Sequence, residues 1–405
     1  MKHRVCLTIL LTAFTAIPLF AERIAMPPLQ MPNAAASGFG GNHVAYTDNV
    51  FALLVNPAAM MQVQQRSFFA LSSSIFNPRN AFRIGRAAAD ILFSNDTSNF
   101  GYTARAISDR EGRITLGLEV REFPFSIAWV ANGFGFALWN RSFIRADIQN
   151  DAAQAVLYND IMLPVGFAFR VLDLHRHSID AGFTLKPFIR VMASDGSIFS
   201  DLINNAQSLQ LDPLVTGIAG GGLDVGFLYR WSGGFQAGIT FTDIFMHAVV
   251  AAHLSRRIDR NSYYIPFAMN AGVSQSFRIS PTLGLTLAAD WRNMKNAFAE
   301  NQGRNPVLDF GAGVQISLSD KVLVRVGMNE MLPSGGLGIH LGMVKIDLAY
   351  YGRELGDRPG ELSATAIDLS FAIRPGARQR NWVWTRGSVL GIFGIERGSS
   401  DTPNP

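Results

Sequence analysis

The feature that most constrains the fold is a period of two between apolar and polar residues, which recurs along the chain. Residues 113–121 place Ile114, Leu116, Leu118 and Val120 on one face, and most residues between them are polar or charged. Side chains of a β-strand point alternately to opposite faces, so this segment is predicted to be a strand with one apolar side. The same pattern occurs in four further segments, which are 179–191, 283–291, 344–350 and 367–374. The sequence therefore predicts a chain built mainly from β-strands.

The first 21 residues have the three parts of an export signal. Residues 2–4 are basic, residues 5–20 are mostly apolar, and Ala21 is a small residue suited to cleavage. We therefore expect a signal peptide that ends at Ala21 and a mature chain that begins at Glu22. The apolar run barely reaches the length of roughly 17 residues that a membrane anchor needs, so an anchor is less favoured.

The composition resembles that of a membrane protein, although membrane helices are missing from the sequence. Charged residues make up 16% of the chain, while Phe and Gly number 30 and 38. Soluble domains usually contain roughly 25% charged residues. After the signal, no stretch approaches the roughly 18 consecutive apolar residues of a membrane helix. Because only helices and closed barrels satisfy the backbone within lipid, the sequence predicts an all-β transmembrane antiparallel barrel in a bacterial outer membrane.

The connections between predicted strands differ in length. Short breaks mostly alternate with longer ones, as in barrels with short periplasmic turns and long extracellular loops. We expect about fourteen strands within residues 63–374. Two of the longer connections carry apolar residues at helical spacing and are predicted to be helical, namely 148–158 and 197–211.

Residues 22–62 precede the strands and differ from them. The stretch 34–60 is rich in Ala, Gly and Asn and ends at Asn56-Pro57-Ala58. Pro57 has a fixed φ and disfavours a helical conformation of Asn56, so the chain bends there. We expect a compact hatch that plugs the barrel. After Arg374, residues 375–405 form either a periplasmic tail or one further strand.

Several basic residues lie on predicted lumen faces. Ionisable residues within a membrane are candidates for function, and cations in a lumen can bind an anionic group of a ligand. The alternative is that they pair with lumen carboxylates such as Glu119, Asp180 and Asp347. The candidate ligand-binding cations are Arg113, Arg121, Lys186, Arg190 and Arg325. Strand prolines that could open the wall, or mark a strand start or bulge, are Pro124, Pro164 and Pro187.

The sequence does not favour an enzyme. No histidine lies in a serine-nucleophile motif such as G-x-S-x-G. His175 and His177 have the spacing of ligands on a strand but fall in a predicted turn, so a solvated turn is preferred to a metal site. No phosphate-binding glycine loop is present, and the scattered net charge of +4 does not indicate nucleic acid. We expect no cofactor, no metal and no catalytic residue. The only cysteine, Cys6, lies in the signal, which excludes a disulfide after processing.

Two segments resemble a known family. The run from Ala45 to Ala59, with Asn56, Pro57 and Ala58 near its end, resembles the hatch of the FadL-like outer-membrane transporters of long-chain fatty acids and aromatic hydrocarbons. The segment 345–357 resembles closing strands of the same superfamily, which includes a branch that serves protein secretion. Barrels of this class usually end on an aromatic residue of the last strand, and this chain instead continues to Pro405.

The resemblance implies import of fatty acids or other hydrophobic compounds, and a partly apolar lumen with a few cations can bind both the tail and the carboxylate of a fatty acid. A compound would diffuse into the lumen and then pass the hatch, or leave sideways through the wall into the membrane. The partners implied are these small molecules, outer-membrane lipid and the barrel insertion machinery. The alternative is a structural or secretion-associated barrel that binds protein partners.

Overall fold

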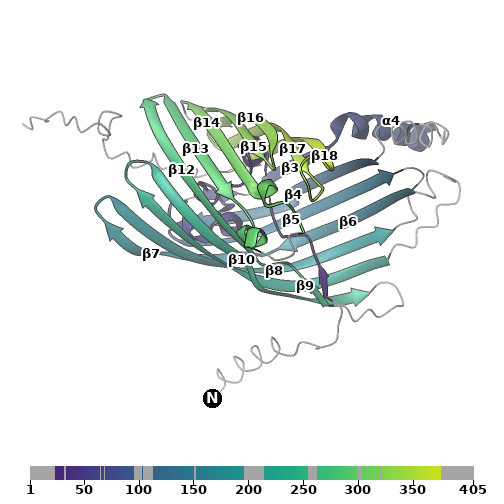
Figure 1. Ribbon diagram of the computed structural model, residues 1–405, viewed down its shortest axis with the longest axis horizontal. Helices are drawn as coiled ribbons and strands as arrows, with labels where there is room; N and C mark the ends of the chain where they lie inside the picture. The colour runs from purple at the N-terminus through teal and green to yellow at the C-terminus, as the bar shows by residue number, and fades with distance from the viewer. Residues whose placement is uncertain are drawn as a thin grey trace, which may run out of the picture.

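The computed structural model shows a closed barrel (Figure 1). It describes residues 23–31, 33–63, 65–67, 69–94, 103, 113–149, 152–195, 214–253, 262–298, 303–319 and 321–374. The proposed signal peptide, the segment 197–211 and the residues after Arg374 lie outside this part of the chain.

The first part of the wall contains the longest strands. These are β2 (Gln65–Ser67), β3 (Phe69–Phe76), β4 (Arg113–Ala131), β5 (Phe134–Gln149), β6 (Ala152–Met162), β7 (Val165–Leu174), β8 (His177–Asp195), β9 (Leu214–Trp231) and β10 (Phe235–His253). β6 and β7 both pair with β5 and β8, so they share one position in the wall. Likewise, β2 and β3 both pair with β4.

The remaining strands are shorter and complete the barrel. They are β11 (Ser262–Tyr264), β12 (Ala268–Ser280), β13 (Leu283–Trp291), β14 (Phe310–Leu318), β15 (Val322–Asn329), β16 (Leu332–Leu341), β17 (Val344–Glu354) and β18 (Ser363–Ile373). β18 pairs with β3, which closes the wall. With each interrupted strand counted once, the described residues form a 14-strand antiparallel barrel, as the sequence predicts.

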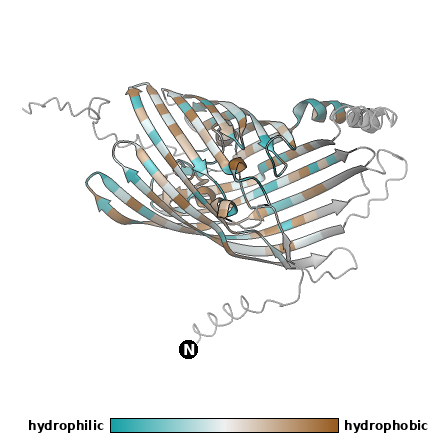
Figure 2. Cartoon of the chain, viewed as in Figure 1, coloured by the Kyte–Doolittle hydropathy of each residue, from teal (hydrophilic) through white to brown (hydrophobic). Residues whose placement is uncertain are grey.

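The strands have one apolar and one polar side because of the alternation in the sequence (Figure 2). In β14, Phe310, Val314, Ile316 and Leu318 are exposed on the outer face, whereas Gln315 is buried in the lumen. The other segments with period-two patterns follow the same rule. Their large apolar side chains form the outer face of the barrel, where they satisfy the requirement for a lipid-facing surface.

Most connections have the predicted distribution between the two ends. Six short turns lie at one end, which we name the short-turn end, at residues 132–133, 175–176, 232–234, 281–282, 319–321 and 342–343. The opposite end, named the long-loop end, carries the connection between β3 and β4, which includes helix α4 (Pro78–Ser94). Within the described residues, no helix has the length and apolar character needed to cross a membrane.

The prediction of a helix at residues 148–158 is wrong. β5 continues to Gln149 and β6 starts at Ala152, and these two residues are paired in the ladder. Apolar residues at helical spacing in so short a segment also fit a strand. The pairing along β5 therefore overrides the local preference.

Candidate functional site

Residues 26–63, named here the N-terminal segment, cross the inside of the barrel. At one end, β1 (Arg23–Ala25) pairs in parallel with β11 at the long-loop end, and at the other end β2 joins the wall near the short turns. Between them, α2 (Ala34–Gly38) contacts β15 to β18, and the 3-10 helix η1 (Pro57–Met61) contacts β4, β5, β7, β8 and β9. A segment that touches opposite walls occupies the lumen (Figure 1).

An apolar cluster joins the N-terminal segment to the wall. Phe51 stacks on Trp139 of β5 with ring centroids 5.4 Å apart, and both side chains are buried. Val50, Leu53 and Met60 of the segment belong to the same cluster, together with wall residues that include Ile218 and Leu228. Helix α3 (Ala52–Val55) presents Ala52 and Leu53 to this cluster. The lumen at this level is therefore packed with apolar side chains.

The first glycine seat consists of Gly182, Gly226 and Gly238 on the neighbouring strands β8, β9 and β10, and it receives Asn56 and Pro57. A Cβ atom at position 182 would lie 2.6 Å from the carbonyl carbon of Pro57. At position 238, it would lie 2.9 Å from the carbonyl oxygen of Val44. The contact at position 182 leaves no room for a side chain, so only glycine allows this approach there. At position 238 a small side chain fits only if the neighbouring Val44 backbone shifts.

The side chain of Asn56 makes three hydrogen bonds within this seat. Its side-chain oxygen accepts from the Ala58 N–H at 3.1 Å and caps η1, which begins with Pro57. Its Nδ2 donates to the Val44 carbonyl at 2.9 Å and to the Phe227 carbonyl at 3.3 Å. Asn56 and Pro57 thus end α3, start η1 and tie both to β9.

A second glycine seat lies on the opposite wall and consists of Gly311, Gly313 and Gly327. It receives the backbone of Phe39 and Gly40, because a Cβ atom at position 327 would lie 2.6 Å from the Gly40 nitrogen. Gly40 itself has a φ of 90°, a conformation that side chains disfavour. These glycines are not singled out by the sequence analysis. Their places on lumen faces of adjacent strands were the signal it missed.

His43 provides a third attachment. Its Nδ1 contacts Asp290 of β13, and its Nε2 lies 2.8 Å from the Phe39 carbonyl oxygen. The Val44 N–H also donates to Asp290, at 2.7 Å. Asp290 therefore fixes the turn between the two seats.

The candidate cations with described side chains all lie in ion pairs. Arg190 donates two hydrogen bonds to Asp160, at 2.6 and 2.8 Å, and a third to the Pro27 carbonyl at 3.0 Å. Lys186 pairs with Asp224 and Asp243 at 2.8 and 2.6 Å. The other two are buried as well. Arg121 pairs with Asp368, and Arg325 pairs with Asp347.

These pairs agree with the alternative that lumen charges neutralise one another. The carboxylates Glu119, Asp180 and Asp347 all take part, Glu119 through Arg141 and Asp180 through Arg170 and Arg230. Arg113 lies at the start of β4 opposite Gln149, and its side chain is outside the described part. A role of any of the five cations in ligand binding stays a prediction.

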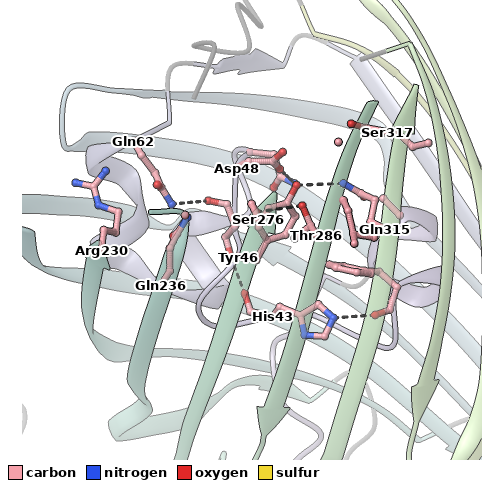
Figure 3. A pocket seen from close by; sticks show the side chains of 18 of the residues that line it. His43, Tyr46, Asp48, Gln62, Arg230, Gln236, Ser276, Thr286, Gln315 and Ser317 are labelled. Atoms are coloured by element: carbon pink, nitrogen blue, oxygen red, sulfur yellow. Dashed lines mark hydrogen bonds between the residues drawn. The ribbon is translucent and has the colours of Figure 1, made fainter. Parts of the chain in front are cut away.

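A cavity of about 500 Å³ lies between the N-terminal segment and the short-turn end of the barrel (Figure 3). Polar side chains such as Tyr46, Gln62, Gln236 and Gln315 point into it, and Gln315 donates to the Tyr46 hydroxyl at 3.1 Å. Burial raises the pKa of Tyr46, so this hydroxyl is neutral. The lining contains seven cations, which are Arg170, Arg176, Arg230, Arg278, Arg325, Lys345 and Arg374, and three carboxylates, which are Asp48, Asp173 and Asp347. Its excess of positive charge favours an anion.

The strand prolines differ in their effect on the wall. The β4–β5 pairing shifts register between Arg121 and Ser126, around Pro124, and within the described residues the β3–β4 pairs end at Arg121. Pro164 separates β6 from β7. Pro187 lies opposite Gly221 in the continuous ladder between β8 and β9. Pro124 and Pro164 therefore interrupt a ladder. Pro187 leaves the β8–β9 ladder intact but lies at the break between the β6 and β7 pairings on the other side of β8.

The two histidines of the β7–β8 connection are exposed. His177 Nδ1 lies 2.7 Å from the Tyr229 hydroxyl, at the start of β8. His175 is in the turn itself. Among the described residues, no three metal-binding side chains lie together in a group that could hold a metal ion.

Comparisons with solved structures find similar barrels. The toluene transporter TodX of Pseudomonas putida has a TM-score of 0.43 and 10% identity and covers 86% of this chain and all of its own, 100%. A FadL homologue of Pseudomonas aeruginosa has a TM-score of 0.40 and 12% identity, covering 85% of this chain and 98% of its own. The toluene transporter TbuX of Ralstonia pickettii has a TM-score of 0.39 and 10% identity, and the alignment covers 85% of this chain and 97% of that chain. No protein-family model and no curated protein sequence matches the chain.

Proposed function

We propose that this protein carries long-chain fatty acids or other hydrophobic compounds across the outer membrane, and that the N-terminal segment is the hatch. The observation that supports this best is the apolar cluster between the segment and the wall. An apolar compound that replaces the segment in these contacts keeps the apolar wall out of water. This burial is favourable by about 25 cal/mol per Å² of apolar surface. A water-filled porin would need a polar lumen instead.

The path proposed runs past the hatch. The segment extends from β11 at the long-loop end to β4 near the short turns, so a compound that enters from the loops meets it. The cavity on the other side gives the compound a place to leave. The ladder interruption around Pro124 offers a second, sideways path, which the experiments below distinguish from the first.

Retention of cellular compounds tests the proposal. Mass spectrometry of the gently purified barrel should find apolar compounds at stoichiometric amounts, and labelled palmitate should displace them saturably. Protein refolded from denaturant is the matched control, because it starts empty and should bind the same palmitate. An empty lumen in the native protein with no saturable binding would contradict transport. A co-purifying protein would then favour the partner-binding barrel.

A further inference from the structure

Lys345 of β17 faces the cavity at the short-turn end. Within the described ranges, its ammonium group has no carboxylate within the ion-pair distance of 4.0 Å. The charges that act on it are Asp48, Asp347, Arg325 and Arg374. Unlike the paired lumen cations, Lys345 can therefore take an anion from the cavity without first losing a salt bridge.

Other basic groups surround Lys345. His340 of β16 lies opposite it in the ladder, and the next pair, Val344 with Ile373, brings Arg374 alongside. Arg374 donates to Glu122 at 3.2 Å, and its Nε is buried without a hydrogen-bond partner in the described structure. Its guanidinium lies 5.2 Å from the ring centroid of Phe51 in the N-terminal segment. The cations thus lie beside the apolar cluster.

Asp48 is the carboxylate of the N-terminal segment that faces this group. Residues 26–63 contain no other Asp or Glu and no Lys or Arg. Of the wall charges, Arg325, Lys345 and Arg374 carry three positive charges against two negative charges on Asp347 and Glu122. Asp48 is exposed in the cavity and supplies the balancing negative charge.

We propose that Lys345 and Arg374 form an anion site on the exit side of the hatch, that its ligand is the carboxylate of an apolar compound, and that Asp48 neutralises it at rest. The inference rests on the function proposed above, since it assigns the ligand class. An incoming carboxylate competes with Asp48 for the same cations, within a cleft where charge interactions are stronger than in bulk water. Its binding removes one attraction between the hatch and the wall, while the tail contacts Phe51.

Two short probes that differ only in charge test the site. Binding of 8,8,8-trifluorooctanoate and of the corresponding trifluorooctanol is measured by fluorine NMR on the full chain in detergent. The variants are Lys345→Gln, Asp48→Asn and, as matched control, Lys321→Gln. Lys321 lies exposed in the β14–β15 turn and outside the cavity lining, so its replacement removes the same charge from the same end.

Lys345→Gln should weaken octanoate binding about tenfold and leave octanol binding unchanged, because one charge-assisted contact is lost. Asp48→Asn should strengthen octanoate binding about threefold, since a competing charge is removed. Such a gain cannot come from misfolding. Lys321→Gln should behave as the unchanged protein.

Three outcomes would overturn the anion site. They are octanoate binding that neither variant alters, equal loss of octanoate and octanol in Lys345→Gln without a gain in Asp48→Asn, and no octanoate binding at all. A different result would contradict the proposed function, namely the absence of retained or displaceable long-chain compounds. If the barrel retains such compounds and their binding does not depend on the charge at position 345, the proposed function stands and the anion site is contradicted.

Discussion

Two arginines of the lumen contact the N-terminal segment directly. Arg190 and Arg141 donate to the carbonyls of Pro27 and Pro28 at 3.0 and 3.3 Å. The ring of Tyr158 lies between them, 4.8 Å from the Arg190 guanidinium and 5.4 Å from that of Arg141. Each guanidinium thus divides its donors between a wall carboxylate and the backbone of the segment, and holds this part of the segment in place.

Replacement of Arg190 measures what its ion pair contributes. Arg190→Met should lower the free energy of unfolding by about 3–5 kcal/mol, because Asp160 is left as an unpaired buried charge. The double variant Arg190→Met with Asp160→Leu should recover most of this loss, since neither charge remains. Urea unfolding in detergent micelles reports both values. Unchanged stability of the single variant together with lost palmitate binding would instead make Arg190 a ligand-binding residue.

The sequence predicts that these charged residues lie on the lumen side of their strands, but it does not predict which residues they pair with. Period-two alternation places Arg121, Lys186 and Arg190 on the lumen side, where the structure has them buried. Arg190 pairs with a residue 30 positions away and Arg121 with one 247 positions away. These partners depend on which strands are neighbours and on their register, which local pattern does not contain.

The strands and their glycines explain how the segment fits inside the wall. Alternation predicts the strands well because each has one lipid face and one lumen face. It fails at residues 148–158, where β5 and β6 extend further than the local pattern indicates. The two glycine seats were also missed, since a glycine in a strand carries no sign of what approaches it until the segment and the wall are placed together.

A side chain in the first glycine seat should displace the hatch. Gly226→Val puts a Cβ atom 3.0 Å from Pro57 Cδ and in conflict with the Asn56 amide, so planar-bilayer conductance should rise severalfold. Gly221→Val is the matched control on the same strand, because the nearest atom to its Cβ, the Cα of Pro187, is 3.8 Å away. Equal conductance of both variants would argue that the seat does not hold the hatch closed.

As a whole, the molecule is a barrel with a long-stranded side, β4 to β10, and a short-stranded side, β12 to β18 (Figure 1). Its N-terminal segment is attached to both sides, to β8, β9 and β10 through Asn56 and Pro57 and to β13 to β15 through Phe39, Gly40 and His43. A transported compound that follows the lumen must therefore loosen at least one attachment. The hatch implied by the resemblance stays a prediction, and the structure shows where the N-terminal segment contacts the wall.

Locking the hatch to the wall tests this account most directly. Val44→Cys with Gly238→Cys places two thiols at neighbouring positions, since a Cβ atom at 238 lies 3.0 Å from Val44 Cγ1. A disulfide needs Cβ atoms about 3.5–4.5 Å apart, which a small adjustment provides. The only native cysteine, Cys6, lies within the expected signal peptide, so no other pairing competes.

Uptake of labelled palmitate into vesicles containing this variant is then measured before and after reduction, with Val44→Cys alone and Gly238→Cys alone as controls. Gly238→Cys alone shows what the side chain at position 238 does without the disulfide. We expect uptake at the level of empty vesicles when the pair is oxidised and full recovery after reduction, because the compound must pass the N-terminal segment. Full uptake by the oxidised variant would contradict the account and place the path through the wall.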